Sequence, residues 1–147
     1  LFRSCVASHP PAGKALRIGL WAVQALMSVA FVLFGLQKLF TAPEALAAMW
    51  HTPWPVEYPW LLRATGVIDA IGGLGLLLPA LTRIRPGLSV AAALGCVLLQ
   101  LAAIAFHVMR GEFAALPLNA VLLALVGFIL WGRRRAPIAP RAPRPLA

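Results

Sequence analysis

The sequence is poor in charged residues, and above all in acidic ones. Of its 147 residues only 12% are charged, with 4 Asp and Glu against 13 Lys and Arg, whereas 61% are hydrophobic. Soluble domains carry about 25% charged residues, and a single core of this length buries only about two thirds of the chain surface. A soluble fold would leave much of the apolar excess in water. The composition therefore excludes an ordinary soluble domain and indicates a membrane protein.

Cysteine and histidine are also scarce. Cys5 and Cys96 stand far apart and form neither a CxxC motif nor a zinc-ligand spacing, which argues against thiol–disulfide chemistry and against a disulfide framework. His107 is the one histidine inside an apolar stretch, so no metal or haem site is predicted. No flavin or nucleotide motif is present either, so an autonomous enzyme is the least favoured class.

Four apolar stretches reach the length of about 20 residues that a helix needs to span a bilayer. They cover residues 16–40, 60–81, 88–108 and 113–131. The first exceeds the roughly 7–15 residues of a signal-peptide core. The predicted fold class is an all-α integral membrane bundle of four transmembrane helices. Residues 1–15 and the basic, proline-rich residues 132–147 are predicted to be disordered cytoplasmic tails.

The connection between the first two spans is predicted to contain a short interfacial helix. Thr41 and Glu44 have the spacing of a capping box, and Pro43 lies in the first turn, which favours a helix from Ala42 to about Trp50. The aromatic residues and prolines that follow are typical of a segment at the depth of the lipid headgroups.

Basic residues predict the orientation. With the N-terminus inside, ten of the thirteen Lys and Arg residues fall on the inner side, and only Lys38, Arg63 and Arg110 fall on the outer side. Both termini are therefore predicted to be cytoplasmic. A net charge of +9 would suggest nucleic acid in a soluble protein. Here the basic residues lie at chain ends and turns, so lipid headgroups are the expected partner and nucleic acid is not.

Polar and small residues recur along the spans at steps of three and four, which places them on helix faces that point into the bundle. These faces carry Gln24, Ser28, Phe31, Gly35 and Lys38; Thr65, Gly66, Asp69, Gly72 and Gly73; Cys96, Gln100, Ala103 and His107; and Asn119, Leu123 and Gly127. The glycines of the second span allow close helix approach, and Leu76 is placed off their face.

Asp69 is the first candidate functional residue, because an ionised residue near the bilayer centre costs about 2.5–3.5 kcal/mol and usually faces a partner or water. We predict that Asp69, Lys38 and His107 form one coupled ionisable cluster that opens to the outer side. The remaining members of the candidate polar cluster are Arg63, Gln100 and Asn119.

Each candidate also has a purely structural interpretation. Lys38 and Arg63 can be interface anchors, and His107 can be a hydrogen-bonded residue at a helix end. Gln100 and Asn119 are expected to bridge helices. Cys96 is expected to be inert packing.

The order of these segments resembles the DoxX and DoxX-like family of small four-helix membrane proteins. The resemblance is carried by FGLQKLF at 34–40, GVIDAIGGLGLLLPALTRIRPGLS at 66–89, AAIAFHVMRGE at 102–112, and Asn119 with the final WGRRR. It covers nearly all of the chain between the tails. Position by position, the matching family residues are Lys38, Asp69, Pro79 and His107, with Asp69 standing where the family usually has Glu.

The resemblance implies a bacterial inner-membrane protein with a redox association, because the family takes its name from a small subunit of a thiosulfate:quinone oxidoreductase. The first hypothesis is an accessory subunit of a quinone-linked system, whose polar cluster binds a partner subunit or a quinone headgroup. The alternative is a small proton-coupled transporter or permeation protein, in which Asp69 and His107 handle a proton or a small solute.

Overall fold

The computed structural model describes residues 13–145, and four long helices make up most of them. They are α1 (Lys14–Phe40), α4 (Pro59–Thr82), α5 (Gly87–Arg110) and α6 (Leu116–Arg135), and the 3₁₀ turn η1 (Phe113–Ala115) leads into α6. All four are long and apolar enough to cross a membrane. This confirms the predicted all-α membrane bundle. Of the predicted tail at 1–15, residues 1–12 lie outside the described residues, and α1 already begins at Lys14.

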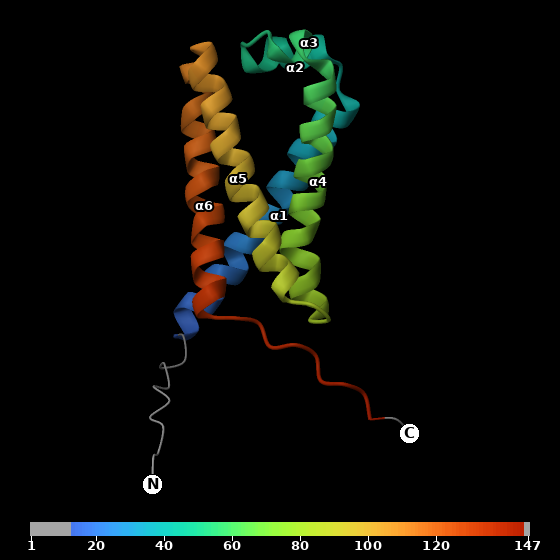
Figure 1. The fold of residues 1–147 in the computed structure, drawn as a ribbon, viewed down its shortest axis with the longest axis vertical. Coiled ribbons are helices and arrows are strands. Elements are labelled where there is room, and N and C mark those ends of the chain that lie inside the picture. Colours follow the sequence, from blue (N-terminus) through green and yellow to red (C-terminus); the bar gives the residue numbers. More distant parts are fainter. Residues whose placement is uncertain (1–12, 146–147) are drawn as a thin grey trace.

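The helices define two ends of the bundle (Figure 1). At the terminal end, α1 begins and α6 ends; at the opposite cap end, two short helices, α2 (Pro43–Trp50) and α3 (Trp54–Glu57), lie across the bundle. Helix α1 is strongly tilted. It lies beside α6 at the terminal end and packs against α4 towards the cap end, while α5 packs between α4 and α6.

Helix α2 is the short helix predicted from Ala42 to about Trp50. Its capping differs from the prediction, because Ala42 is the N-cap and no side chain caps the helix, so the Thr41–Glu44 capping box does not form. The cap is seated on the bundle by a small apolar cluster in which Leu46 and Trp54 are buried against Leu62 of α4.

Glycines allow α1 and α4 to approach closely. A Cβ atom on Gly73 would lie 2.7 Å from the carbonyl oxygen of Ser28, and one on Gly35 would lie 2.6 Å from the carbonyl oxygen of Gly66. At this distance the Ser28 hydroxyl donates a 2.6 Å hydrogen bond to the Gly73 carbonyl oxygen. Close contact of this kind holds membrane helices together, because lipid gives no hydrophobic force between them. The predicted small-residue interface is confirmed.

Two predicted helix faces need correction. Leu76 is fully buried, so its placement off the glycine face was wrong: it follows Gly73 by three residues and shares its face. The buried face of α6 runs through Leu122, Val126, Ile129 and Arg133. The predicted face, with Asn119, Leu123 and Gly127, is only half-buried, because α6 is turned by about one residue relative to that stripe.

The segment predicted to be a disordered tail after residue 131 begins as helix. Helix α6 continues to Arg135, and the described residues that follow, 136–145, run across the terminal end (Figure 1). There the Arg141 N–H donates to the Arg83 carbonyl oxygen at 2.8 Å, and Arg83 Nε donates to the Ala139 carbonyl oxygen at 2.8 Å. This segment is therefore attached to the end of α4.

Candidate functional site: an ion pair in the bundle and a network at the cap

Asp69 and Lys38 form an ion pair inside the bundle. Lys38 Nζ lies 2.7 Å from Asp69 Oδ2, and the two side chains are 19% and 4% exposed. Asp69 is ten residues into α4, which is about 15 Å of helix rise from the cap end. A carboxylate at this depth is stable as an ion only when a close opposite charge offsets its desolvation. The contact is one of the two alternatives that the sequence left open for Lys38, and its functional role stays a prediction.

The lack of a side chain at Gly66 lets Lys38 come close enough to α4 to pair with Asp69. A Cβ atom on Gly66 would lie 2.9 Å from the Cβ of Lys38, so any side chain at position 66 would push the last turn of α1 away from α4. Lys38 would then be withdrawn from Asp69, one turn further along the same face of α4.

Arg63 extends this contact towards the cap end. Its Nη1 donates to the carbonyl oxygens of Lys38 and, at 3.2 Å, of Thr41. Carbonyls in the last turn of a helix have no partner within the helix, and a positive charge there interacts favourably with the helix dipole. Arg63 therefore joins α4 to the end of α1.

A second polar group lies at the cap end around Glu112. Its carboxylate accepts hydrogen bonds from Thr52 Oγ1 at 2.7 Å and Arg110 Nε at 2.9 Å, and it lies 2.7 Å from His107 Nδ1. Arg110 also pairs with Glu57 of α3. These contacts tie the end of α5 to the cap.

The turn after α5 explains why Glu112 reaches His107. Gly111 has a φ of 70°, a conformation that favours glycine. The N–H of Glu112 then donates to the His107 carbonyl oxygen at 2.9 Å, and that of Gly111 donates to the Val108 carbonyl oxygen at 3.1 Å. This is a Schellman motif, and it brings the carboxylate back over the last turn of α5.

Aromatic rings pack beside His107 and Arg110 of this cap-end network. The Trp54 ring meets Phe106 and His107 edge to face, with centroids 5.8 and 6.4 Å apart. The Arg110 guanidinium lies over Tyr58 and Phe106, 5.6 and 5.3 Å from their centroids. The Glu57 side chain in this network stays 46% exposed, so part of the network is open at the surface of the cap.

The groups around Glu112 lower the pKa of its carboxyl. Burial acts to raise the pKa of this carboxyl, but hydrogen bonds from Thr52, His107 and Arg110, together with the charge of Arg110, lower it below its ordinary value of 4.5. Glu112 is therefore ionised at neutral pH.

The structure divides the predicted single cluster into two groups. Lys38, Asp69 and Arg63 come together between α1 and α4, whereas His107 bonds to Glu112 at the cap end. His107 is three residues from the end of α5 and so lies nearer the cap than Asp69. The glycine turn supplies a closer acceptor for His107 than Asp69 does. In the sequence, the turn is indicated by the run HVMRGE at 107–112, in which a glycine stands between the end of the apolar span and Glu112.

Gln100 and Asn119 were expected to bridge helices. Asn119 Nδ2 instead donates at 2.8 Å to the carbonyl oxygen of Ala115, four residues before it. Gln100 is buried, and its Oε1 has no hydrogen-bond partner among residues 13–145. Neither residue joins the two groups described above.

Sequence reasoning missed a third polar contact at the terminal end. Arg133 is 3% exposed; its Nε donates to Gln24 Oε1 at 2.7 Å, and its guanidinium lies over the Trp21 ring, 4.8 Å from the centroid. Gln24 in turn donates to the Leu76 carbonyl oxygen. Gln24 lies on the predicted inward face of α1, but its partner Arg133 was assigned to the predicted tail at 132–147.

Among residues 13–145, no three His, Cys, Asp or Glu side chains come together as metal ligands. Cys96 is a buried free thiol, and Cys5 lies outside the described residues. Pro79, which the family resemblance also matched, lies inside α4.

Four spanning helices of this composition define a multi-pass membrane protein. Residues 22–129 match the DoxX-like family, and since this is well over half of the chain, the chain belongs to that family. No curated protein and no solved structure matches it.

Proposed function

We propose that this DoxX-like protein acts as an accessory subunit of a redox system in the membrane, rather than as an autonomous enzyme or transporter. The observation that supports this most is the closed Lys38–Asp69 pair. A carboxylate that carries protons or solutes must change partners during its cycle, whereas this one is buried and held by a lysine of the neighbouring helix. Its role is to hold α1 against α4.

The contacts of the polar residues run within the protein: Lys38 donates to Asp69, Arg63 donates to the end of α1, and His107 Nδ1 contacts Glu112. None of these contacts points to a quinone headgroup. We therefore assign no quinone chemistry to these residues. In the proposed complex, quinone chemistry belongs to the partner subunit.

The alternative function is proton-coupled transport, and the His107–Glu112 contact favours it. A histidine and a carboxylate 2.7 Å apart can exchange a proton, and this pair lies at one membrane surface where it can meet water. Against this, Glu112 also accepts from Thr52 and Arg110, which hold the carboxylate in its ionised form.

The proposed location is a bacterial inner membrane, with the terminal end in the cytoplasm. Among the described residues, basic side chains are concentrated at that end, in the first turn of α1, the α4–α5 turn, the last turn of α6 and the segment after it. Lys38, Arg63 and Arg110 lie in the other half. Such asymmetry in short flanking segments is typical of the cytoplasmic side.

The experiment that tests the proposal purifies the tagged full chain from its native membranes in a mild detergent. We expect a redox-active membrane subunit, identified by mass spectrometry and its absorption spectrum, to co-elute in fixed stoichiometry. We also expect liposomes containing the protein alone to show no proton flux above empty liposomes.

Proton flux through the purified protein would contradict the proposal and support the transporter. The matched variants are His107→Gln, which removes the proton-exchanging ring, and Glu44→Gln on the exposed face of α2. A transporter would lose flux in the first variant and keep it in the second.

A further inference from the structure

An open groove lies at the terminal end of the bundle, where α4 ends and α5 begins (Figure 1). Its volume is about 230 Å³, and it is lined by Leu78, Pro79, Thr82, Ile84, Arg85 and Leu88. One water needs about 10–15 Å³ of such space. The groove is therefore large enough for a segment of a flexible chain and not only for a single water or ion.

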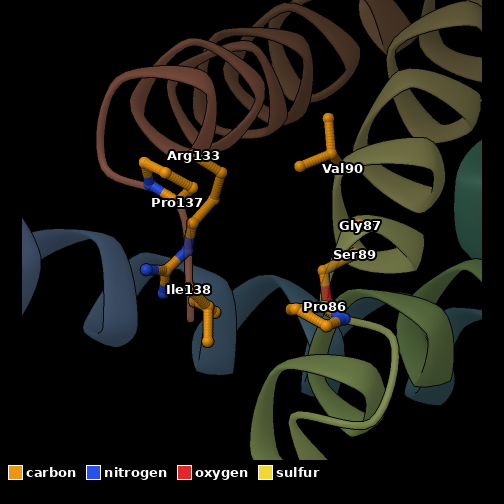
Figure 2. Close-up of a pocket in the computed structure, with 7 residues that line it drawn as sticks. All are labelled: Pro86, Gly87, Ser89, Val90, Arg133, Pro137 and Ile138. Carbon is orange, nitrogen blue, oxygen red and sulfur yellow. The ribbon is translucent and has the colours of Figure 1, made fainter. Parts of the chain in front are cut away.

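A second cavity, on the other side of the start of α5, is smaller and partly covered (Figure 2). It measures about 50 Å³ and lies between α5, the end of α6 and the segment that carries Pro137 and Ile138. The groove, in contrast, is lined only by residues from 78–88. Along the described chain, neither α6 nor the segment after it covers the groove, so it is open to whatever surrounds α4 and α5.

The walls of the groove are mostly apolar and face outward. Leu78, Ile84 and Leu88 are 50%, 71% and 53% exposed. The hydroxyl of Thr82 already donates, at 2.9 Å, to the carbonyl oxygen of Leu78. Lipid tails are as apolar as leucine side chains, so an acyl chain is suited to these walls.

Arg85 adds a positive charge to one end of the groove. It is an exposed residue of the turn between α4 and α5, and its side chain lines the groove. Three of the chain's 4 acidic residues lie at the cap end, and the fourth, Asp69, is paired with Lys38. No acidic residue of the chain therefore neutralises Arg85.

Two further arginines lie beside this turn. Arg83 follows the last residue of α4, and the N–H of Arg141 donates to its carbonyl oxygen at 2.8 Å. Basic residues at a membrane surface attract anionic lipid headgroups. A second copy of the chain, in contrast, would bring another basic turn without acidic residues against the groove and would be repelled.

We propose that the groove holds one anionic phospholipid, with an acyl chain along Leu78 and Leu88 and the headgroup phosphate at Arg85. The groove and the lipid share the same order of groups, with charge at the membrane surface and apolar contact below it. A guanidinium donates charge-assisted hydrogen bonds to phosphate oxygens. A zwitterionic lipid offers the same acyl chains without a net negative charge, so the basic turn favours the anionic lipid.

The test uses the full chain, purified in an uncharged detergent and depleted of lipid. It is mixed with phosphatidylglycerol or with phosphatidylcholine of the same acyl chains, and native mass spectrometry counts the lipids that the protein retains. We expect the wild type to retain one phosphatidylglycerol in preference to phosphatidylcholine, by about fivefold or more.

Two pairs of variants locate the lipid. Arg85→Gln is expected to lower the preference about fivefold, whereas Arg134→Gln removes the same charge from an exposed position in the last turn of α6 and should keep it. Leu78→Trp fills the groove and should reduce retention of phosphatidylglycerol. Leu81→Trp adds the same ring at an exposed position outside the groove and should have no effect. All four positions are exposed, so these variants are expected to fold.

Three results would overturn the proposal. The first is equal retention of the two lipids by the wild type. The second is a preference that Arg85→Gln and Arg134→Gln lower equally, because general surface charge would then explain it. The third is retention that Leu78→Trp leaves unchanged. In that case, loss of a co-purifying protein in Leu78→Trp but not in Leu81→Trp would assign the groove to a protein partner instead.

Discussion

Replacing Gly73 by alanine tests the close packing of α1 on α4. A Cβ atom at this position would lie 2.7 Å from the Ser28 carbonyl oxygen and 2.8 Å from Val32 Cγ2, so α1 would have to move. Overpacking of this kind costs about 1–3 kcal/mol, and the stretched Ser28–Gly73 hydrogen bond adds about 0.6 kcal/mol. The higher helix propensity of alanine offsets about 1 kcal/mol. We expect a net destabilisation of roughly 1–2 kcal/mol, and a larger one for Gly73→Leu.

The assay is unfolding of the detergent-solubilised protein, followed by helicity as a function of temperature or denaturing detergent. The matched control is Gly95→Ala, because a Cβ atom on Gly95 meets nothing within 4 Å. This variant gains helix propensity without crowding, so its stability is expected to equal or exceed that of the wild type. Equal stability of the two alanine variants would refute the packing argument.

Two further predictions concern the cap and the orientation. The pKa of Glu112 lies below its ordinary value of 4.5 in the folded protein, so the stability that it contributes is present above pH 4.5 and is lost as the pH falls through the folded pKa. Tryptophan fluorescence of the cap should show this acid step in the wild type and no such step in Glu112→Gln. An identical step in the wild type and the variant would contradict the assignment to Glu112. Reporter fusions after Pro86 and near Pro55 should report opposite sides of the membrane, the first cytoplasmic, and reports from one side would refute the four-span topology.

The fold followed from the sequence because length and apolarity decide which segments can span a bilayer. The predicted spans 16–40 and 60–81 differ from α1 and α4 by at most two residues at either end. The pairing of Lys38 with Asp69 was one of two alternatives that the sequence offered. A buried carboxylate needs a cation, and helix periodicity places both residues on inward faces.

Contacts that depend on turns and tilts could not be predicted in the same way. His107 pairs with Glu112 because Gly111 reverses the chain, and hydrophobic periodicity does not report such a turn. Arg133 is buried because the tilt of α1 brings Gln24 beside the end of α6. In the sequence, Arg133 is one of three consecutive arginines and is indistinguishable from its exposed neighbours.

The central claim is that Lys38 and Asp69 act as one structural unit between α1 and α4, and a double-mutant cycle with Lys38→Met and Asp69→Asn tests it most directly. Residues in contact show coupling energies of about 0.5–3 kcal/mol, and breaking a buried pair leaves an uncompensated charge. We expect the double variant to lose at least about 1 kcal/mol less stability than the sum of the single losses. The parallel cycle of Asp69→Asn with His107→Gln should be additive. Additive losses for Lys38 and Asp69 would contradict the account.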